Sequence, residues 1–140
     1  YGLEALSRGA KHVHFVENNR KIFKDLKQNF EKVKKSACLI EKSASFSNRD
    51  VVEFLRKKEN TYDLIFLDPP YKDFPKIGNS VFDLLTTHDF VHQDTLLIHE
   101  APREEVSSFE NWKLFKVLGK EKTRAPNFRF YIPDFSASGQ

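Results

Sequence analysis

One stretch of the chain, residues 64–71 (Leu-Ile-Phe-Leu-Asp-Pro-Pro-Tyr), combines a short apolar run with an abrupt stop. An unbroken run of four apolar residues is typical of a strand buried on both faces, as in a parallel sheet. The two prolines end that strand, because neither can donate a hydrogen bond to a sheet ladder and each fixes its own φ. The pattern therefore predicts that Asp68 and Tyr71 lie just past the carboxyl end of an interior strand, where open α/β sheets bind ligands.

The residues after this predicted strand offer groups that suit a planar ligand carrying an exocyclic amine. Asp68 supplies a carboxylate, the carbonyls of Asp68 and Pro69 have no ladder to join, and Tyr71 supplies a flat π face. The alternative is a buried strand that ends in a rigid turn, with Asp68 as a helix cap and Tyr71 as packing. The apolar strand, Asp-Pro-Pro and the aromatic ring together favour a functional site.

Helical and strand patterns alternate along most of the chain. Apolar residues recur at helical spacing in four segments, which predicts helices near residues 3–7, 22–33, 51–55 and 81–88. Strands are predicted between these helices, at residues 12–17, 37–40, 64–67 and 95–99. Two further strands, at residues 112–117 and 128–132, follow each other without a helix, which favours antiparallel pairing. This order predicts an α/β fold with a Rossmann-like, doubly wound mixed sheet, mostly parallel and ending in a C-terminal antiparallel hairpin.

Length and composition narrow the class of protein. The 140 residues suffice for one domain with a hydrophobic core, predicted at residues 1–135, with a flexible tail at 136–140. The lone Cys38 gives no disulfide framework, and the five histidines lack metal-ligand spacing, so no metal is expected. No stretch approaches a membrane span, and we expect a reducing, cytoplasmic setting with no membrane partner. The formal charge of +3 permits a polyanionic partner without requiring one.

Three candidate sites fall at successive element ends: Gly2, Glu17 and the segment from Asp68 to Tyr71. In a nucleotide-binding α/β sheet, a glycine lets the backbone approach the ligand at the first turn. An acid at the end of the next strand then hydrogen-bonds the ribose hydroxyls, and Glu17 is placed for that role. Taken alone, Glu17 is better explained as an acid that interacts with a helix N-terminus, and only its position in the series favours ribose binding.

The chain resembles the class I S-adenosylmethionine-dependent methyltransferases, and within them the RsmD family of 16S ribosomal RNA guanine-N2 methyltransferases. The resemblance rests on residues 2–10 (Gly-Leu-Glu-Ala-Leu-Ser-Arg-Gly-Ala), 15–17 (Phe-Val-Glu) and 66–71, and on the order of strands. It implies that Gly2 is the last glycine of a Gly-x-Gly-x-x-Gly loop around the methionine end of the cofactor. The first strand and the earlier glycines would then precede Tyr1, so we expect the chain to be a fragment of a longer protein.

The resemblance also implies a reaction, a partner and roles for individual residues. The protein would move a methyl group from S-adenosylmethionine to the N2 amine of a guanine in small-subunit ribosomal RNA, acting as a monomer on that RNA or on a small-subunit assembly particle. Hydrogen bonds from the amine to Asp68 and the Pro69 carbonyl would localise its lone pair, and Tyr71 would stack on an unpaired or flipped base. The implied catalytic residues are Asp68, Pro69, Pro70 and Tyr71; the cofactor residues are Gly2, Glu17, Asn18, Ser43, Ala44 and Asp68; the substrate residues are Tyr71, Lys72 and Arg124.

Two departures from the family pattern leave alternatives open. Many such enzymes place an acid against the adenine amine at the end of the third strand, where this chain has Ser43. The second departure is the connection at residues 122–127, which lacks the expected glycine. Four basic residues near the predicted pocket are candidate phosphate contacts: Lys72, Lys76, Arg124 and Arg129. One alternative is methylation of another amine, in adenine, cytosine or a glutamine amide. Another is a degenerate fold that only binds RNA or a partner, which Ser43 favours.

Overall fold

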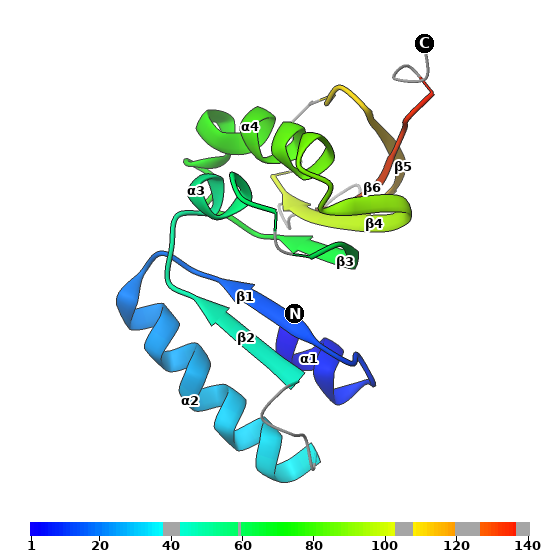
Figure 1. The fold of residues 1–140 in the computed structure, drawn as a ribbon. Coiled ribbons are helices and arrows are strands. Elements are labelled where there is room, and N and C mark those ends of the chain that lie inside the picture. Colours follow the sequence, from blue (N-terminus) through cyan, green and yellow to red (C-terminus); the bar gives the residue numbers. More distant parts are fainter. Residues whose placement is uncertain (38–42, 59, 103–107, 120–126, 137–140) are drawn as a thin grey trace. The chain divides into compact units, whose positions relative to one another are not determined.

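The computed structural model describes residues 1–37, 43–58, 60–102, 108–119 and 127–136. The chain divides into two compact units, Tyr1–Phe54 and Leu55–Gln140, called here the N-terminal unit and the C-terminal unit. Each unit combines helices with a sheet, which confirms the predicted α/β class (Figure 1). Among the described residues the strands form two sheets, one of two strands and one of four.

The N-terminal unit is built on a two-stranded parallel sheet. Its elements are α1 (Gly2–Ser7), β1 (Val13–Val16), α2 (Arg20–Ala37) and β2 (Ala44–Ser47), and α3 (Val51–Leu55) begins within it. The two strands pair in register from Val13 with Ala44 to Val16 with Ser47. Phe15 stacks on Phe46 at 5.2 Å between ring centroids, and the buried ring of Phe30 from α2 meets Phe46 edge-on at 5.4 Å. These aromatic contacts fix α2 against the sheet.

The strand predicted at residues 37–40 is not the one that pairs with β1 in the described part of the chain. Ala37 is the last residue of α2, residues 38–40 lie outside the described part of the chain, and the strand that pairs with β1 is Ala44–Ser47. The sequence Ala-Ser-Phe-Ser has only one large apolar residue, so the run of apolar residues before it gave the stronger local signal. What places the strand is the contact of Phe46 with Phe15 and Phe30, which no local pattern contains.

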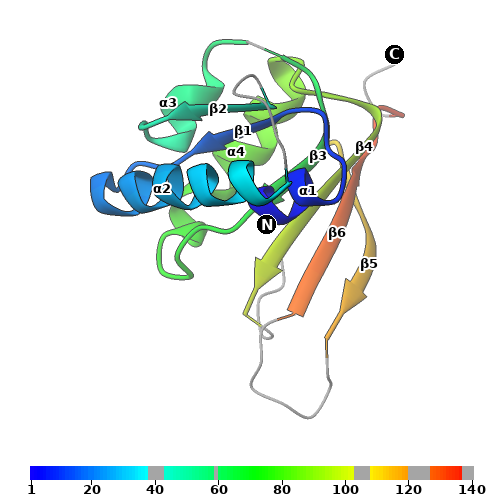
Figure 2. The ribbon, with the colours of Figure 1, turned by 90° about the horizontal axis from the view of Figure 1, so that it is seen from below.

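The C-terminal unit is built on a four-stranded mixed sheet in the order β3-β4-β6-β5. Its elements are β3 (Tyr62–Leu67), α4 (Phe74–Thr87), β4 (Val91–Ala101), β5 (Trp112–Leu118) and β6 (Asn127–Pro133). β3 and β4 run parallel, and β6 runs antiparallel to both β4 and β5, which confirms the predicted hairpin (Figure 2). α4 covers one face: its Phe82 ring packs edge-on against Tyr131, and its Phe82 carbonyl accepts a hydrogen bond from the Trp112 indole at 3.0 Å.

Two details of this unit differ from the sequence prediction. β3 was predicted as an interior strand, but it is an edge strand of the described sheet, and Leu64 is 43% exposed. A run of apolar residues indicates that both faces of a strand are covered by other side chains. It does not indicate whether another strand pairs with each of its two edges. The fourth helix was predicted near residues 81–88, yet α4 begins at Phe74, because Pro75 suits the first turn of a helix.

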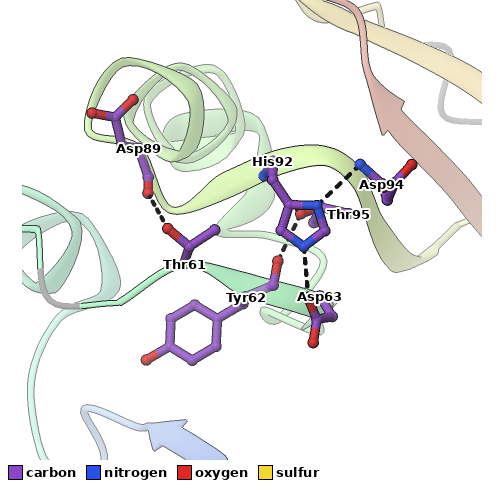
Figure 3. A network of polar contacts seen from close by, with 7 residues as sticks. All are labelled: Thr61, Tyr62, Asp63, Asp89, His92, Asp94 and Thr95. Carbon is purple, nitrogen blue, oxygen red and sulfur yellow. Dashed lines mark hydrogen bonds and ion pairs between the residues drawn. The ribbon is translucent and has the colours of Figure 1, made fainter.

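A polar network fixes the amino ends of β3 and β4 (Figure 3). The register of this pair shifts between Tyr62 and Leu64, and the network lies at that shift. The Nδ1 atom of His92 accepts the Asp94 backbone N–H at 3.1 Å, so its Nε2 carries the proton and donates to Asp63 at 2.6 Å. The hydroxyl of Thr95 donates to the Tyr62 carbonyl at 2.6 Å. These bonds hold the irregular start of β4 at the opposite end of the strands from Asp68.

Candidate functional site

The segment from Asp68 to Tyr71 leaves the sheet at the carboxyl end of β3. Leu67 is buried at 8% exposure, and the chain then turns through the two prolines, with the Pro70 carbonyl accepting the backbone N–H groups of Asp73 at 2.9 Å and Phe74 at 3.2 Å. Asp73, not Asp68, is the residue that precedes α4, so Asp68 is not a helix cap. Tyr71 is 45% exposed and therefore is not core packing. The structure thus removes both parts of the purely structural explanation of this segment.

Glu100 lies beside Asp68, and sequence reasoning assigned it no role. Leu67 pairs with His99 in the parallel ladder, so Asp68 and Glu100 follow at the carboxyl ends of adjacent strands. Burial raises the pKa of Asp68, and the Glu100 carboxylate raises it further by its negative charge and by a hydrogen bond between the two carboxyl groups. The sequence signal that could have found Glu100 is an acid at the end of the next predicted strand.

Tyr71 shares the surroundings of these two carboxyl groups. Desolvation raises the pKa of its phenol, and the negative charges of Glu100 and then of Asp68 raise it further. The phenol therefore stays protonated and can donate a hydrogen bond. An exposed aromatic ring next to two carboxyl groups is suited to a planar ligand that carries N–H donors.

A buried layer lies beneath this cluster. His99 is 1% exposed, and its ring lies 4.0 Å from the ring of Phe74, centroid to centroid. Burial lowers the pKa of His99 to about 4, and the positive charge of Arg129, its neighbour in the β4–β6 ladder, lowers it as well. Arg129 is itself 6% exposed, which corrects its expected role as a phosphate contact, because a buried guanidinium cannot reach RNA. Lys72 and Lys76 are exposed, and Arg124 lies outside the described residues.

In the N-terminal unit, polar groups gather at the carboxyl ends of β1 and β2. Glu17 follows β1, and its backbone N–H donates to the Ser47 carbonyl at 3.0 Å. The Asn48 amide donates to the Glu17 carbonyl at 2.8 Å, while the Glu17 carboxylate accepts the Asn19 backbone N–H at 3.1 Å. Asn19, rather than Glu17, caps α2, since its side-chain oxygen accepts the N–H groups of residues 21 and 22. Glu17 is therefore held at the strand end without serving as the cap.

Ser43 and Ala44 do not join this cluster. They were expected at the carboxyl end of a strand, but Ser43 is buried just before β2, and Ala44 pairs with Val13, at the other end of the two-stranded sheet from Glu17. The residues that follow β2 are Asn48 and then Asp50. Asp50 caps α3 by accepting the backbone N–H groups of Val52 at 3.0 Å and Glu53 at 3.2 Å.

Gly2 allows a close approach between α1 and β1. A Cβ atom at this position would lie 2.9 Å from Cζ of Phe15 and 3.0 Å from Cγ1 of Val13, which is closer than side-chain packing permits. The Phe15 ring cannot move away easily, because it stacks on Phe46. Close helix–strand packing is the role of the third glycine in a dinucleotide-binding turn. Asn18, the other residue predicted here, is exposed beside Glu17.

Metal sites and membrane-spanning helices are two further features to consider in the described residues. Within the ranges that the structure describes, no group of three or more His, Cys, Asp or Glu side chains could hold a metal ion. In the same part of the chain, no helix is both long and apolar enough to cross a membrane.

Comparison with known proteins gives consistent matches. The family described as Conserved hypothetical protein 95 matches residues 1–132. The Ribosomal RNA small subunit methyltransferase D of Haemophilus influenzae is 29% identical over 133 residues, which cover 93% of this chain and 64% of the relative. The protein of the same name from Buchnera aphidicola is 26% identical over 117 residues, which cover 82% of this chain and 57% of the relative. The chain thus spans less than two thirds of the length of either relative.

Solved structures agree on the fold. A candidate methylase from Haemophilus influenzae superposes with a TM-score of 0.77 at 26% identity, covering 95% of this chain and 72% of that one. A conserved hypothetical protein from Streptococcus pyogenes superposes with a TM-score of 0.79 at 19% identity, covering 94% of this chain and 78% of the other.

Proposed function

The chain belongs to the family described as Conserved hypothetical protein 95, the RsmD family, and on this premise we propose that the protein is an S-adenosylmethionine-dependent RNA methyltransferase. Its proposed target is the exocyclic N2 amine of a guanine in small-subunit ribosomal RNA, free or in an assembly particle. The observation that carries the proposal is the segment from Asp68 to Tyr71, which presents a carboxyl group and an exposed aromatic ring at a strand end. We also propose that the protein acts in the cytoplasm and as a monomer, as the sequence analysis predicts.

The residues of the N-terminal unit fit the nucleoside part of the cofactor. Glu17 is held at the end of β1 by bonds from Asn19 and Asn48, and a carboxylate there suits the two hydroxyl donors of a ribose. The close packing at Gly2 fits the last glycine of a cofactor loop. When bound, S-adenosylmethionine supplies an electrophilic methyl group on a sulfonium.

The residues of the C-terminal unit would orient the amine. An amine conjugated to a purine ring is a weak nucleophile, so its lone pair must be localised and aligned. In the proposed mechanism, the Asp68 carboxylate and the Pro69 carbonyl accept the two amine protons while Tyr71 stacks on the flipped base. The bond between the methyl carbon and the sulfonium sulfur would break as the C–N bond forms, leaving its electron pair on sulfur, and the nitrogen would pass one proton to Asp68. Orientation supplies most of the rate, because no other acid–base step is needed.

Replacing Asp68 tests this proposal. We expect Asp68→Ala to lower kcat/KM for methyl transfer about hundredfold or more, because the amine loses its orienting acceptor. The measurement is incorporation of labelled methyl groups into small-subunit RNA from a strain that lacks the enzyme, using protein expressed from the complete gene. Asp73→Ala is the matched control, since Asp73 lies in the same loop and makes no side-chain cap bond. Full activity of Asp68→Ala would contradict the mechanism.

The alternatives separate by product and by cofactor binding. Mass spectrometry of the modified product distinguishes N2-methylguanine from methylated adenine, cytosine or glutamine. The degenerate binding module was favoured by Ser43 at a strand end, and the structure places Asn48 and Asp50 there instead. The position of Ser43 therefore no longer favours the binding module. Calorimetry that shows no S-adenosylmethionine binding would still support it.

A further inference from the structure

Glu100 has no role in the proposed mechanism, although its carboxyl group interacts with Asp68 at the end of the described sheet. The parallel register places the two residues one step beyond the Leu67–His99 pair, on adjacent strands. Their carboxyl groups hydrogen-bond to each other, and the phenol of Tyr71 lies within the electrostatic reach of both. Two carboxyl groups and one exposed ring thus converge on one place at the end of the sheet.

We infer that Glu100 is a specificity residue of the proposed site, whose carboxylate accepts the N1–H of guanine while Asp68 accepts a proton of the N2 amine. The inference rests on the proposed function and deepens it, because it names the chemical feature by which the site selects its base. Glu100 would touch the substrate without taking part in the transfer of the methyl group.

The hydrogen-bonding edges of the bases supply the chemical reason. Guanine presents two adjacent donors, N1–H and the N2 amine, on its Watson–Crick edge. Adenine and cytosine present their amine beside a ring nitrogen with a lone pair. Ionised carboxylates only accept hydrogen bonds, so a pair of carboxylates matches the two donors of guanine. With adenine or cytosine, one carboxylate of the pair would face the lone pair of a ring nitrogen. A site built to pair with a donor rejects an analogue that lacks it, because a buried polar group is left unpaired.

The geometry allows both bonds to form on one base. Adjacent strands lie about 4.8 Å apart, so carboxyl groups from neighbouring strand ends can reach adjacent atoms of one ring edge. In the absence of RNA, the negative charge of Glu100 and a hydrogen bond to it both raise the pKa of the Asp68 carboxyl group. Two N–H donors placed between them would replace that bond and offset the repulsion. The Tyr71 ring, 45% exposed, is available to stack on the base held there.

The test compares guanine with 2-aminopurine, which keeps the reactive amine but lacks O6 and has a lone pair in place of N1–H. The methylated nucleotide is first mapped by mass spectrometry, and RNA fragments are then made with either base at that position. For the wild-type protein from the complete gene, we expect kcat/KM to favour guanine by about tenfold to hundredfold. Glu100→Ala should lower kcat/KM on guanine and leave kcat/KM on 2-aminopurine unchanged, so the ratio between the two bases falls.

Two further variants make the result specific. Glu100→Gln keeps an acceptor of the same shape and adds an amide donor, so we expect less than about a tenfold loss on guanine and a gain on 2-aminopurine. Glu110→Ala removes an exposed acid of the same unit and should leave the ratio unchanged. An unchanged base preference in both Glu100 variants, or an equal loss on both bases, would overturn the inference while leaving the proposed function intact. A wild-type protein that methylates no guanine would overturn both.

Discussion

His99 is an ionisable side chain held neutral in the core of the C-terminal unit. Its pKa is about 4 in the folded protein, because it is buried and faces the positive charge of Arg129, while its ordinary value is 6.5. At neutral pH both the folded and the unfolded chain hold it neutral. As pH falls below the ordinary pKa, only the unfolded chain takes up the proton, so the folded state loses stability until the folded pKa is reached.

The unfolding free energy should therefore fall by roughly 1–3 kcal/mol through His99 between about pH 7 and about pH 4. Urea denaturation across this range should show a flatter pH dependence for His99→Gln than for the wild type. Asn18→Ala removes an exposed side chain that does not titrate and serves as the control, which should keep the wild-type slope. Equal slopes for His99→Gln and the wild type would show that His99 is not held neutral by the fold.

At this scale, the sequence predicted the residues that lie past a strand end but not those that face inward. Asp68 and Tyr71 could be found because prolines mark the end of β3. Arg129 was expected to contact phosphate, yet its place beside His99 in the ladder buries it. The face on which a strand residue lies depends on pairing register, which a charged side chain does not reveal.

At the scale of elements, the N-terminus of α2 provides a sharp comparison between adjacent residues. Asn19 accepts two backbone N–H groups of the first turn at 3.0 Å each, whereas Asn18 is exposed and does not cap the helix. Asn19→Ala should lower the unfolding free energy by about 1 kcal/mol, because these donors lose their partner. Asn18→Ala should change it by less than about 0.5 kcal/mol. Chemical denaturation of both variants measures the difference, and equal losses would show that the cap is unimportant.

The terminal hairpin was predicted correctly, because the short connection between its two strands is a local feature of the sequence. The helix caps are local features too: Asn19 and Asp50 each accept backbone N–H groups from the helix that follows them. The position of β2 could not be predicted, because its single phenylalanine is placed by Phe15 and Phe30 from other elements. That error also displaced Ser43 and Ala44 from the strand end where cofactor residues were expected.

For the whole molecule, alternation of helices and strands predicted the α/β class, but not the division of the described strands into two sheets. The neighbours of β3 depend on strands distant in the sequence, so its apolar run could not show that it is an edge strand of the described sheet. The two units also have different roles in the proposed function. The proposed cofactor contacts of Gly2 and Glu17 belong to the N-terminal unit, and the proposed base contacts of Asp68, Tyr71 and Glu100 belong to the C-terminal unit.

Substitutions in the two units should therefore weaken the binding of different ligands. Glu17→Ala should raise the Kd for S-adenosylmethionine about tenfold to hundredfold, since a hydrogen bond to a charged group is lost, and should leave RNA affinity unchanged. Tyr71→Ala should raise the Kd for RNA by a similar factor through lost stacking, with cofactor affinity unchanged. Calorimetry with the cofactor and filter binding with RNA, on protein from the complete gene, measure the two constants separately.

Two variants serve as controls and should behave as the wild type: Glu53→Ala, which removes an exposed acid on α3, and Tyr71→Phe, which keeps the aromatic ring. If either Glu17→Ala or Tyr71→Ala weakened both ligands equally, the assignment of cofactor and base to separate units would be wrong.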